Sequence, residues 1–146
     1  GAPPDVRLST DVDMPLVTGL VRATVLLPAS AVEVLTPAER AMVICHELAH
    51  VRRRDLLFGW VPAVAERLFF FHPLARIAAR EYAIEREAAC DALVLRAMDA
   101  SPGDYGHVLM RLGVGDPAPS LSAGGSSPSA SMLKRRLAHA AARSRC

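Results

Sequence analysis

Residues 46–50, His-Glu-Leu-Ala-His, set two imidazoles and a carboxylate within an apolar run, AMVICHELAHV. On a helix, residues four apart point the same way, so His46 and His50 share one face. Imidazole nitrogens at this spacing suit zinc, and Glu47, turned by about 100° from His46, can reach a water without ligating the metal. The segment therefore predicts one zinc ion per chain, which acidifies a water whose proton Glu47 accepts.

A catalytic zinc ion takes three protein ligands and keeps one position open, so a third ligand must come from another segment. The apolar stripe of a predicted helix over residues 73–98 carries Glu87 and Asp91, whereas Glu85 points away from that stripe. We expect Glu87 to be the third ligand. Asp91, one turn later, is expected to accept the free N–H of a ligand histidine. A solvated helix face, or a salt bridge to a nearby arginine, is the alternative for both carboxylates.

Other residues of reactive types are weaker candidates. His72 precedes a proline and is expected to be a helix cap or core histidine rather than a third zinc ligand. An oxyanion could be stabilised by Tyr82, Arg86 or Tyr105, and the spacing selects none of them. The remaining candidates are expected in structural or surface roles. Cys45 and Cys90 are expected to be buried thiols that point away from the site. Arg52, Arg53 and Arg54 are expected to form a solvated face, with Asp55 paired to one of them, and His107 and His139 are expected on the surface.

The elements that must position these side chains follow from local sequence signals. Residues 6–28 predict strands, with alternation in VRLSTDVD and a β-branched run ending at Pro28. Thr36-Pro-Ala-Glu39 is a capping box that starts a central helix over 37–55. Further helices are predicted from residue 55 with a break near Gly59 and Pro62, then over 73–98 and over 104–112. The fold class is therefore α+β, mainly helical, with a small N-terminal β-hairpin or sheet packed on the metal-binding helix.

Composition narrows the class of protein further. The chain has 146 residues, of which 51% are hydrophobic, which suits one domain with a sizeable core. Its net charge of +2 gives no electrostatic reason to expect a nucleic-acid partner. The apolar stretch 56–79 is interrupted by prolines and charges, so we interpret it as a core helix. The alternative is a segment that contacts a membrane or a transmembrane helix that is absent from this chain.

HELAHVRRRD, followed by FFFHPLARIAAREYAIEREAACDALVL, resembles the peptidase domain of the integral-membrane zinc metallopeptidases of the beta-lactam-sensing regulator type, the Bla/Mec antirepressor family. Other segments of that family are similar to MPLVTGLVRATVLLP with LTPAER, to YGHVLMRLG and to LKRRLAHA. The resemblance implies a zincin-like fold of the gluzincin type. His46 and His50 match the zinc histidines, and Glu47 matches the catalytic glutamate. Glu87 matches the third ligand, and Asp91 matches the acidic residue one turn after it.

Composition and the resemblance together divide the chain into three parts, and the resemblance implies a function. Residues 1–112 are the expected zinc metallopeptidase domain, and 113–131 are a flexible Gly/Pro/Ser-rich linker. Residues 132–146 are a short basic segment, at most a short helix, with a solvated end. Members of such a family lie between transmembrane helices at the cytoplasmic face of the bacterial membrane and cleave themselves or a transcriptional repressor. The expected partners are a peptide or protein substrate and the flanking transmembrane helices or membrane surface, and the excised domain is expected to be soluble.

Two further readings stay open. The chain could be a zinc-stabilised signalling or interaction module whose peptidase activity is absent or latent. A plain helical domain with an accidental HELAH would bind no metal. If the chain is an endopeptidase, a strand within residues 20–28 could pair with an extended substrate.

Overall fold

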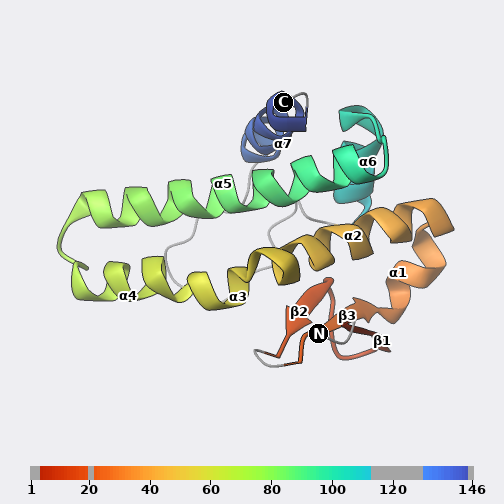
Figure 1. Ribbon diagram of the computed structural model, residues 1–146, viewed down its shortest axis with the longest axis horizontal. Coiled ribbons are helices and arrows are strands. Elements are labelled where there is room, and N and C mark those ends of the chain that lie inside the picture. Colours follow the sequence, from red (N-terminus) through yellow and green to blue (C-terminus); the bar gives the residue numbers. More distant parts are fainter. Residues whose placement is uncertain (1–3, 20–21, 113–129, 145–146) are drawn as a thin grey trace.

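The computed structural model describes residues 4–19, 22–112 and 130–144, and within those ranges it contains a three-stranded sheet and seven helices (Figure 1). The mainly helical α+β class is thereby confirmed. The strands are β1 (Asp5–Ser9), β2 (Leu16–Thr18) and β3 (Thr24–Pro28). The helices are α1 (Ala29–Val34), α2 (Pro37–Arg53), α3 (Asp55–Phe58), α4 (Trp60–Leu68), α5 (Pro73–Ala97), α6 (Pro102–Arg111) and α7 (Ala130–Ser144).

The sheet has the order β1-β3-β2, so β3 is central. β3 pairs with β1 in parallel and with β2 in antiparallel orientation. Val25 and Leu27 of β3 are buried in one apolar cluster with Val43 of α2 and Val108 of α6. The sheet therefore packs on the helix that carries the HELAH segment, as the sequence predicted, and β2 is the edge strand nearer to that helix (Figure 1).

The start of α2 follows the predicted capping box. The Thr36 hydroxyl accepts a hydrogen bond from the Glu39 N–H at 3.3 Å, and the Glu39 carboxylate accepts one from the Thr36 N–H at 2.7 Å. The helix was expected to continue to residue 55, but it ends at Arg53 because Arg54 adopts the left-handed conformation, with φ 57°. This conformation is uncommon for a residue with a Cβ. It redirects the chain so that α3 begins at Asp55, beside the last turn of α2.

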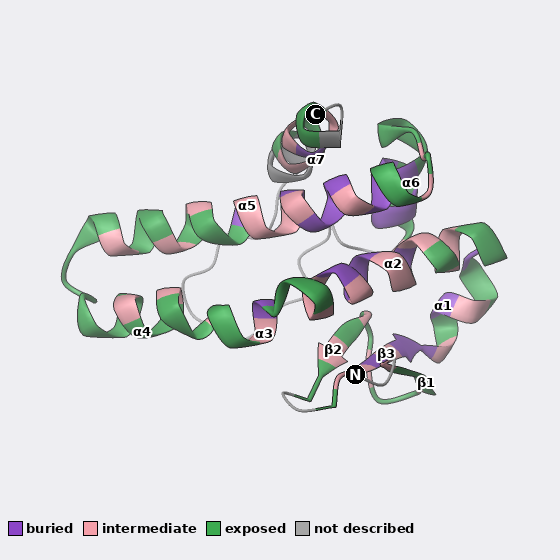
Figure 2. Cartoon of the chain, viewed as in Figure 1, coloured by how far each residue is buried: buried purple, intermediate pink, exposed green. Residues whose placement is uncertain are grey.

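α5 is the longest helix and packs along both α2 and α4 (Figure 1). Ala88 and Ala92 are buried on α5, and their small side chains allow α2 to approach closely. Figure 2 shows that burial is concentrated in α2, α6 and the C-terminal half of α5, whereas α4 and the N-terminal part of α5 are largely exposed. Within the described residues, no helix is both long enough and apolar enough to span a bilayer.

Three features of the fold differ from what the sequence indicated. The core-helix reading of residues 56–79 fails because most of their large apolar side chains are exposed. Helix α1 was not predicted, and it begins directly after the strand that ends at Pro28. The basic segment 132–146 lies largely in helix α7, which is consistent with a short helix there, but α7 is not solvated all round, because it packs on α5 and α6 with Ala140 fully buried. Gly106 of α6 permits this contact, because a Cβ there would lie 3.0 Å from the Leu137 side chain.

The expected linker over residues 113–131 falls almost wholly outside the described residues. The division of the chain into three parts therefore stays a prediction.

Candidate metal centre

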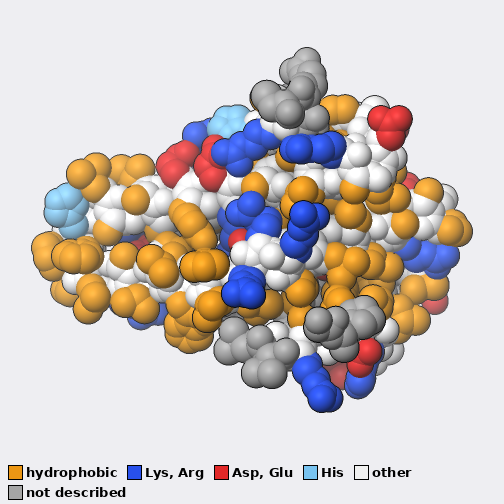
Figure 3. Space-filling model, viewed as in Figure 1, with side chains coloured by type: hydrophobic (Ala, Val, Ile, Leu, Met, Phe, Trp, Pro, Cys, Tyr) orange, Lys and Arg blue, Asp and Glu red, His pale blue; other side chains and the backbone are white. Residues whose placement is uncertain are grey.

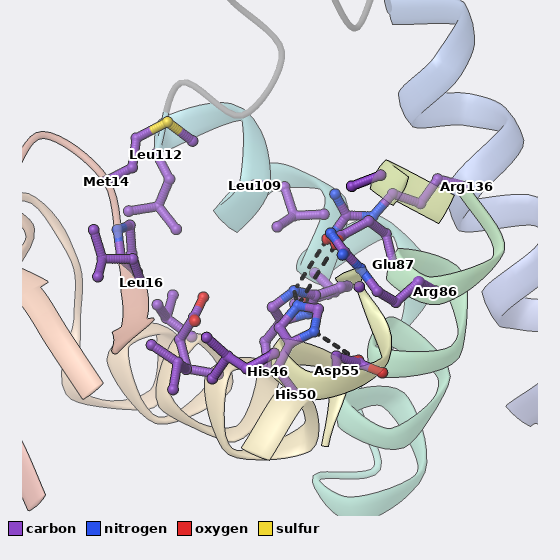
Figure 4. A pocket seen from close by; sticks show the side chains of 18 of the residues that line it. Met14, Leu16, His46, His50, Asp55, Arg86, Glu87, Leu109, Leu112 and Arg136 are labelled. Carbon is purple, nitrogen blue, oxygen red and sulfur yellow. Dashed lines mark hydrogen bonds and ion pairs between the residues drawn. The ribbon is translucent and has the colours of Figure 1, made fainter. Parts of the chain in front are cut away.

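Helices α2 and α5 bring the three predicted ligands together (Figure 4). The Nε2 atoms of His46 and His50 lie 3.2 Å apart. Carboxylate oxygens of Glu87 lie 3.5 Å from Nε2 of His46 and 3.6 Å from Nε2 of His50. Two imidazole nitrogens and one carboxylate that converge on one point form a donor set typical of catalytic zinc, so these residues fit the metal.

The Nδ1 side of His46 faces a buried network. Asp91 Oδ1 lies 3.0 Å from His46 Nδ1, and the Asp91 side chain is fully buried. The Tyr105 hydroxyl donates to the same carboxylate at 2.8 Å and lies 3.0 Å from His46 Nδ1. Asp91 thus lies where the sequence predicted it, and such a carboxylate fixes the orientation and tautomer of a ligand histidine. Because its hydroxyl is used on this side of the imidazole, Tyr105 positions His46 and does not suit the oxyanion role.

His50 has an orienting carboxylate that sequence reasoning missed. Asp55 Oδ2 lies 2.8 Å from His50 Nδ1 and accepts a hydrogen bond from Arg53 Nε at 3.2 Å, which confirms the expected pairing of Asp55 with the arginine run. The left-handed Arg54 brings Asp55 into this position, and no sequence signal reveals that turn.

The expectation that Cys90 points away from the site is wrong. Its sulfur lies 3.4 Å from His50 Nδ1 and 3.5 Å from the Asp55 carboxylate. The helical phase of Cys90 could not reveal its contact with Asp55, because the left-handed Arg54 determines where Asp55 lies. Burial raises the pKa of the Cys90 thiol, and the charge of Asp55 raises it further, so the group stays protonated.

Arg136 of α7 completes the centre from a segment far along the chain. Its Nε donates to Asp91 at 2.5 Å, and its Nη2 donates to the other Asp91 oxygen at 2.9 Å. The same Nη2 lies 3.4 Å from Glu87. One guanidinium therefore connects Glu87, the predicted third ligand, to the carboxylate that lies against His46. Sequence reasoning missed Arg136 because it lies in the tail that was expected to be solvated.

The charges of the site follow from burial and these contacts. Burial alone would lower the pKa of His46, but hydrogen bonds with Asp91 and Glu87 outweigh it and raise the pKa to about 9. Burial opposes ionisation of Glu87, yet the hydrogen bond to His46 and the charge of Arg136 hold its pKa well below the ordinary value. Metal ligands must be deprotonated, so a metal bound here would displace the proton that these contacts favour on His46.

Glu47 differs from Glu87 in environment. It is buried beside the ligands, and this burial raises the pKa of its carboxyl, opposed by the nearby charge of His46. A raised pKa makes the carboxylate a better proton acceptor near neutral pH. Glu47 also lines the same cavity as His46 and His50, which is where the sequence predicts a general base.

The site opens into a cavity of about 570 Å³. In Figure 4, Met14, Leu16 and Leu112 line one side, and His46, Glu87 and Arg136 line the other. An apolar cavity with a few convergent polar groups is the usual form of a ligand site.

Of the weaker candidates, Arg86 lines the cavity and donates a hydrogen bond to Glu87, whereas Tyr82 is exposed and does not line the cavity. His72 is exposed at the N-cap of α5, and His107 is also exposed. Cys45 packs against the core, and His139 pairs with Glu85 at 2.7 Å.

We predict that Arg136→Gln lowers zinc affinity about 10- to 100-fold, the usual effect of losing a group that orients metal ligands. The neutral amide cannot hold Asp91 and Glu87 in place. Arg135→Gln is the matched control, because Arg135 is the adjacent residue, is exposed and pairs with Glu81 at 2.6 Å. Competition with a chromophoric chelator measures both affinities. Equal affinity of the two variants would contradict the role assigned to Arg136.

Comparisons with known proteins agree with this geometry. A family model described as BlaR1 peptidase M56 matches residues 2–139. The methicillin resistance mecR1 protein of Staphylococcus aureus (strain Mu50 / ATCC 700699) is 33% identical over 94 residues, which cover 64% of this chain and 16% of that protein. The regulatory protein BlaR1 of Bacillus licheniformis is 29% identical over 98 residues, with 66% and 16% covered. The chain thus spans about a sixth of the length of these relatives. No solved structure matches it.

Proposed function

The chain belongs to the BlaR1 peptidase M56 family, and on this premise we propose that it is the zinc endopeptidase domain of a membrane-bound signalling regulator. The observation that carries the proposal is the convergence of His46, His50 and Glu87 beside Glu47 at one cavity. Both histidines are oriented by buried carboxylates, as ligand histidines usually are. The active site is accordingly of the gluzincin type, with one zinc ion per chain.

The residues of the chain divide the chemistry among them. When bound, a zinc ion supplies Lewis acidity to the attacking water and to the scissile carbonyl. Glu47 removes a proton from that water, holds it, and returns it to the leaving amine. Arg136 and Arg86 keep Glu87 ionised through their charges and hydrogen bonds. Asp91 and Asp55 keep the two imidazoles aligned throughout.

The substrate in this proposal is an extended segment of a protein that enters the cavity along β2. The sequence suggested a strand within residues 20–28 for this purpose, but β3 is paired on both of its edges. β2 is at the edge of the sheet, and residues 14–17 line the cavity. An extended peptide can add to such an edge through main-chain hydrogen bonds. By likeness to the regulatory relatives, the substrate is a transcriptional repressor or a copy of the regulator itself, cleaved at the cytoplasmic face of the membrane.

The test is the metal dependence of peptide-bond hydrolysis. The chain is stripped with a chelator, assayed on an unfolded protein such as casein, and assayed again after one equivalent of zinc. We expect hydrolysis to disappear on stripping and to return with zinc. Hydrolysis that persists without metal would contradict the proposal. Uptake of one zinc ion without any hydrolysis would favour the signalling module instead.

A further inference from the structure

A second surface of the molecule is unusual in its aromatic side chains. We define the apolar hairpin as residues 57–77, which cover the end of α3, α4, the connecting loop and the start of α5. The chain has four phenylalanines and one tryptophan, and all of them lie in this hairpin. Each is more than half exposed: Phe58, Trp60, Phe69, Phe70 and Phe71. Large aromatic side chains normally supply core burial, so this concentration in contact with water indicates a surface that another phase or molecule covers.

The exposed apolar side chains form a continuous surface. Those on the helical part recur at helical spacing, and the tip and the first turns of α5 extend them: Leu57, Trp60, Val61, Val64 and Leu68, then Leu74 and Ile77. α4 contains no buried residue. Hydrophobic side chains gather over this end of the molecule (Figure 3), and the hairpin projects past the sheet and α7 (Figure 1).

Charges around the hairpin indicate what covers it. Residues 52–80 carry six exposed arginines: Arg52, Arg53, Arg54, Arg67, Arg76 and Arg80. They carry a single exposed acidic residue, Glu66, since Asp55 is buried against His50. An apolar surface with exposed aromatics and a surplus of arginine is complementary to an anionic lipid surface. A second copy of the chain would bring the same positive charge to the contact, which disfavours self-association.

We propose that the apolar hairpin inserts into the interfacial region of an anionic lipid bilayer. The base of the hairpin also borders the candidate active site, because Gly59, Trp60 and Ala63 line the cavity. Insertion therefore holds the mouth of the cavity at the membrane surface. The hairpin does not supply any of the groups that ligate metal or move protons, so this inference stands apart from the proposed peptidase function.

Trp60 is the sole tryptophan and therefore reports on the hairpin directly. Its fluorescence is measured as vesicles are added to the Glu47→Gln chain, which excludes loss of protein through self-cleavage. The vesicles contain phosphatidylcholine alone or with phosphatidylglycerol. We expect a blue shift with the anionic vesicles, weaker with phosphatidylcholine alone, and quenching by lipids with brominated acyl chains. This quenching on the unsubstituted hairpin tests insertion without a hairpin variant.

A paired substitution tests the surface itself. Phe70→Asp with Phe71→Asp should lower partition into anionic vesicles at least about tenfold, since each buried aromatic ring contributes strongly to membrane binding. Val6→Asp with Leu8→Asp, on exposed positions of β1, is the matched control and should leave partition unchanged. Near-UV circular dichroism checks that both variants are folded.

Three results would overturn the inference. The first is a tryptophan spectrum that does not change when vesicles are added. The second is equal partition of the hairpin variant and the unsubstituted chain into the vesicles. The third is a blue shift that depends on protein concentration in the absence of lipid and coincides with the mass of a dimer in light scattering. Vesicle binding without hydrolysis would support membrane insertion and contradict the proposed peptidase function. Hydrolysis without vesicle binding would support the peptidase function and contradict membrane insertion.

Discussion

Replacing Glu47 by Gln should lower the rate of peptide-bond hydrolysis by about 10²- to 10⁴-fold, the usual contribution of a positioned proton acceptor. Glutamine keeps the size of the side chain and cannot take the proton. The two imidazoles and Glu87 are untouched, so the variant should still hold one zinc ion per chain. Hydrolysis of casein and zinc content by atomic absorption are the two measurements.

Glu33→Gln is a suitable control, because Glu33 is exposed on α1, away from the cavity lining. It should hydrolyse at the rate of the unsubstituted chain. A Glu47→Gln chain that cleaves at that same rate would rule out Glu47 as the base. If neither the variant nor the unsubstituted chain cleaves while both hold zinc, the zinc-stabilised signalling module becomes the better description.

Replacing Glu87 by Ala should weaken zinc binding by more than about 100-fold, beyond the range caused by loss of an orienting group. The substitution removes one of three ligands. It also removes the carboxylate that Arg136 faces at 3.4 Å, so that only Asp91 offsets the positive charge of the guanidinium beside the metal. Chelator competition measures the affinity, and hydrolysis should fall with zinc occupancy.

The chain offers a close control in Glu85→Ala. Glu85 lies two residues earlier on α5 and pairs with His139 and Arg143 of α7, away from the ligands. This variant should keep its zinc. If Glu87→Ala also keeps it, the metal is held elsewhere, and the second group of donors, formed by His50, Asp55 and Cys90, becomes the candidate.

Helical periodicity was sufficient to predict that four polar side chains of two helices come together. His46, His50, Glu87 and Asp91 lie on two helices whose apolar stripes must face each other, so their phases alone bring them together. The capping box at Thr36 likewise fixed the start of α2, since both of its hydrogen bonds are local. Such features need only the regular geometry of a helix and the rule that apolar faces are buried.

Other features depended on information that periodicity lacks. Asp55 reaches His50 only because Arg54 is left-handed, and Arg136 reaches Asp91 across a long separation in sequence. The pairing order that makes β2 the edge strand is also a property of the tertiary fold. For residues 56–79, hydrophobicity indicated that the apolar side chains are buried but not what buries them. The prediction of a core helix was wrong, because most of these side chains are exposed in the fold.

The contact of Arg136 with Asp91 affects the order in which the centre forms during synthesis on the ribosome. Translation adds roughly 5–20 residues per second from the N-terminus, so both histidines and Glu87 emerge before α7. Until then, Asp91 and Glu87 lack the guanidinium that binds both of them. The nascent chain thus carries every predicted metal donor before the contacts that hold them in place are complete, and ordering of the centre depends on the synthesis of α7.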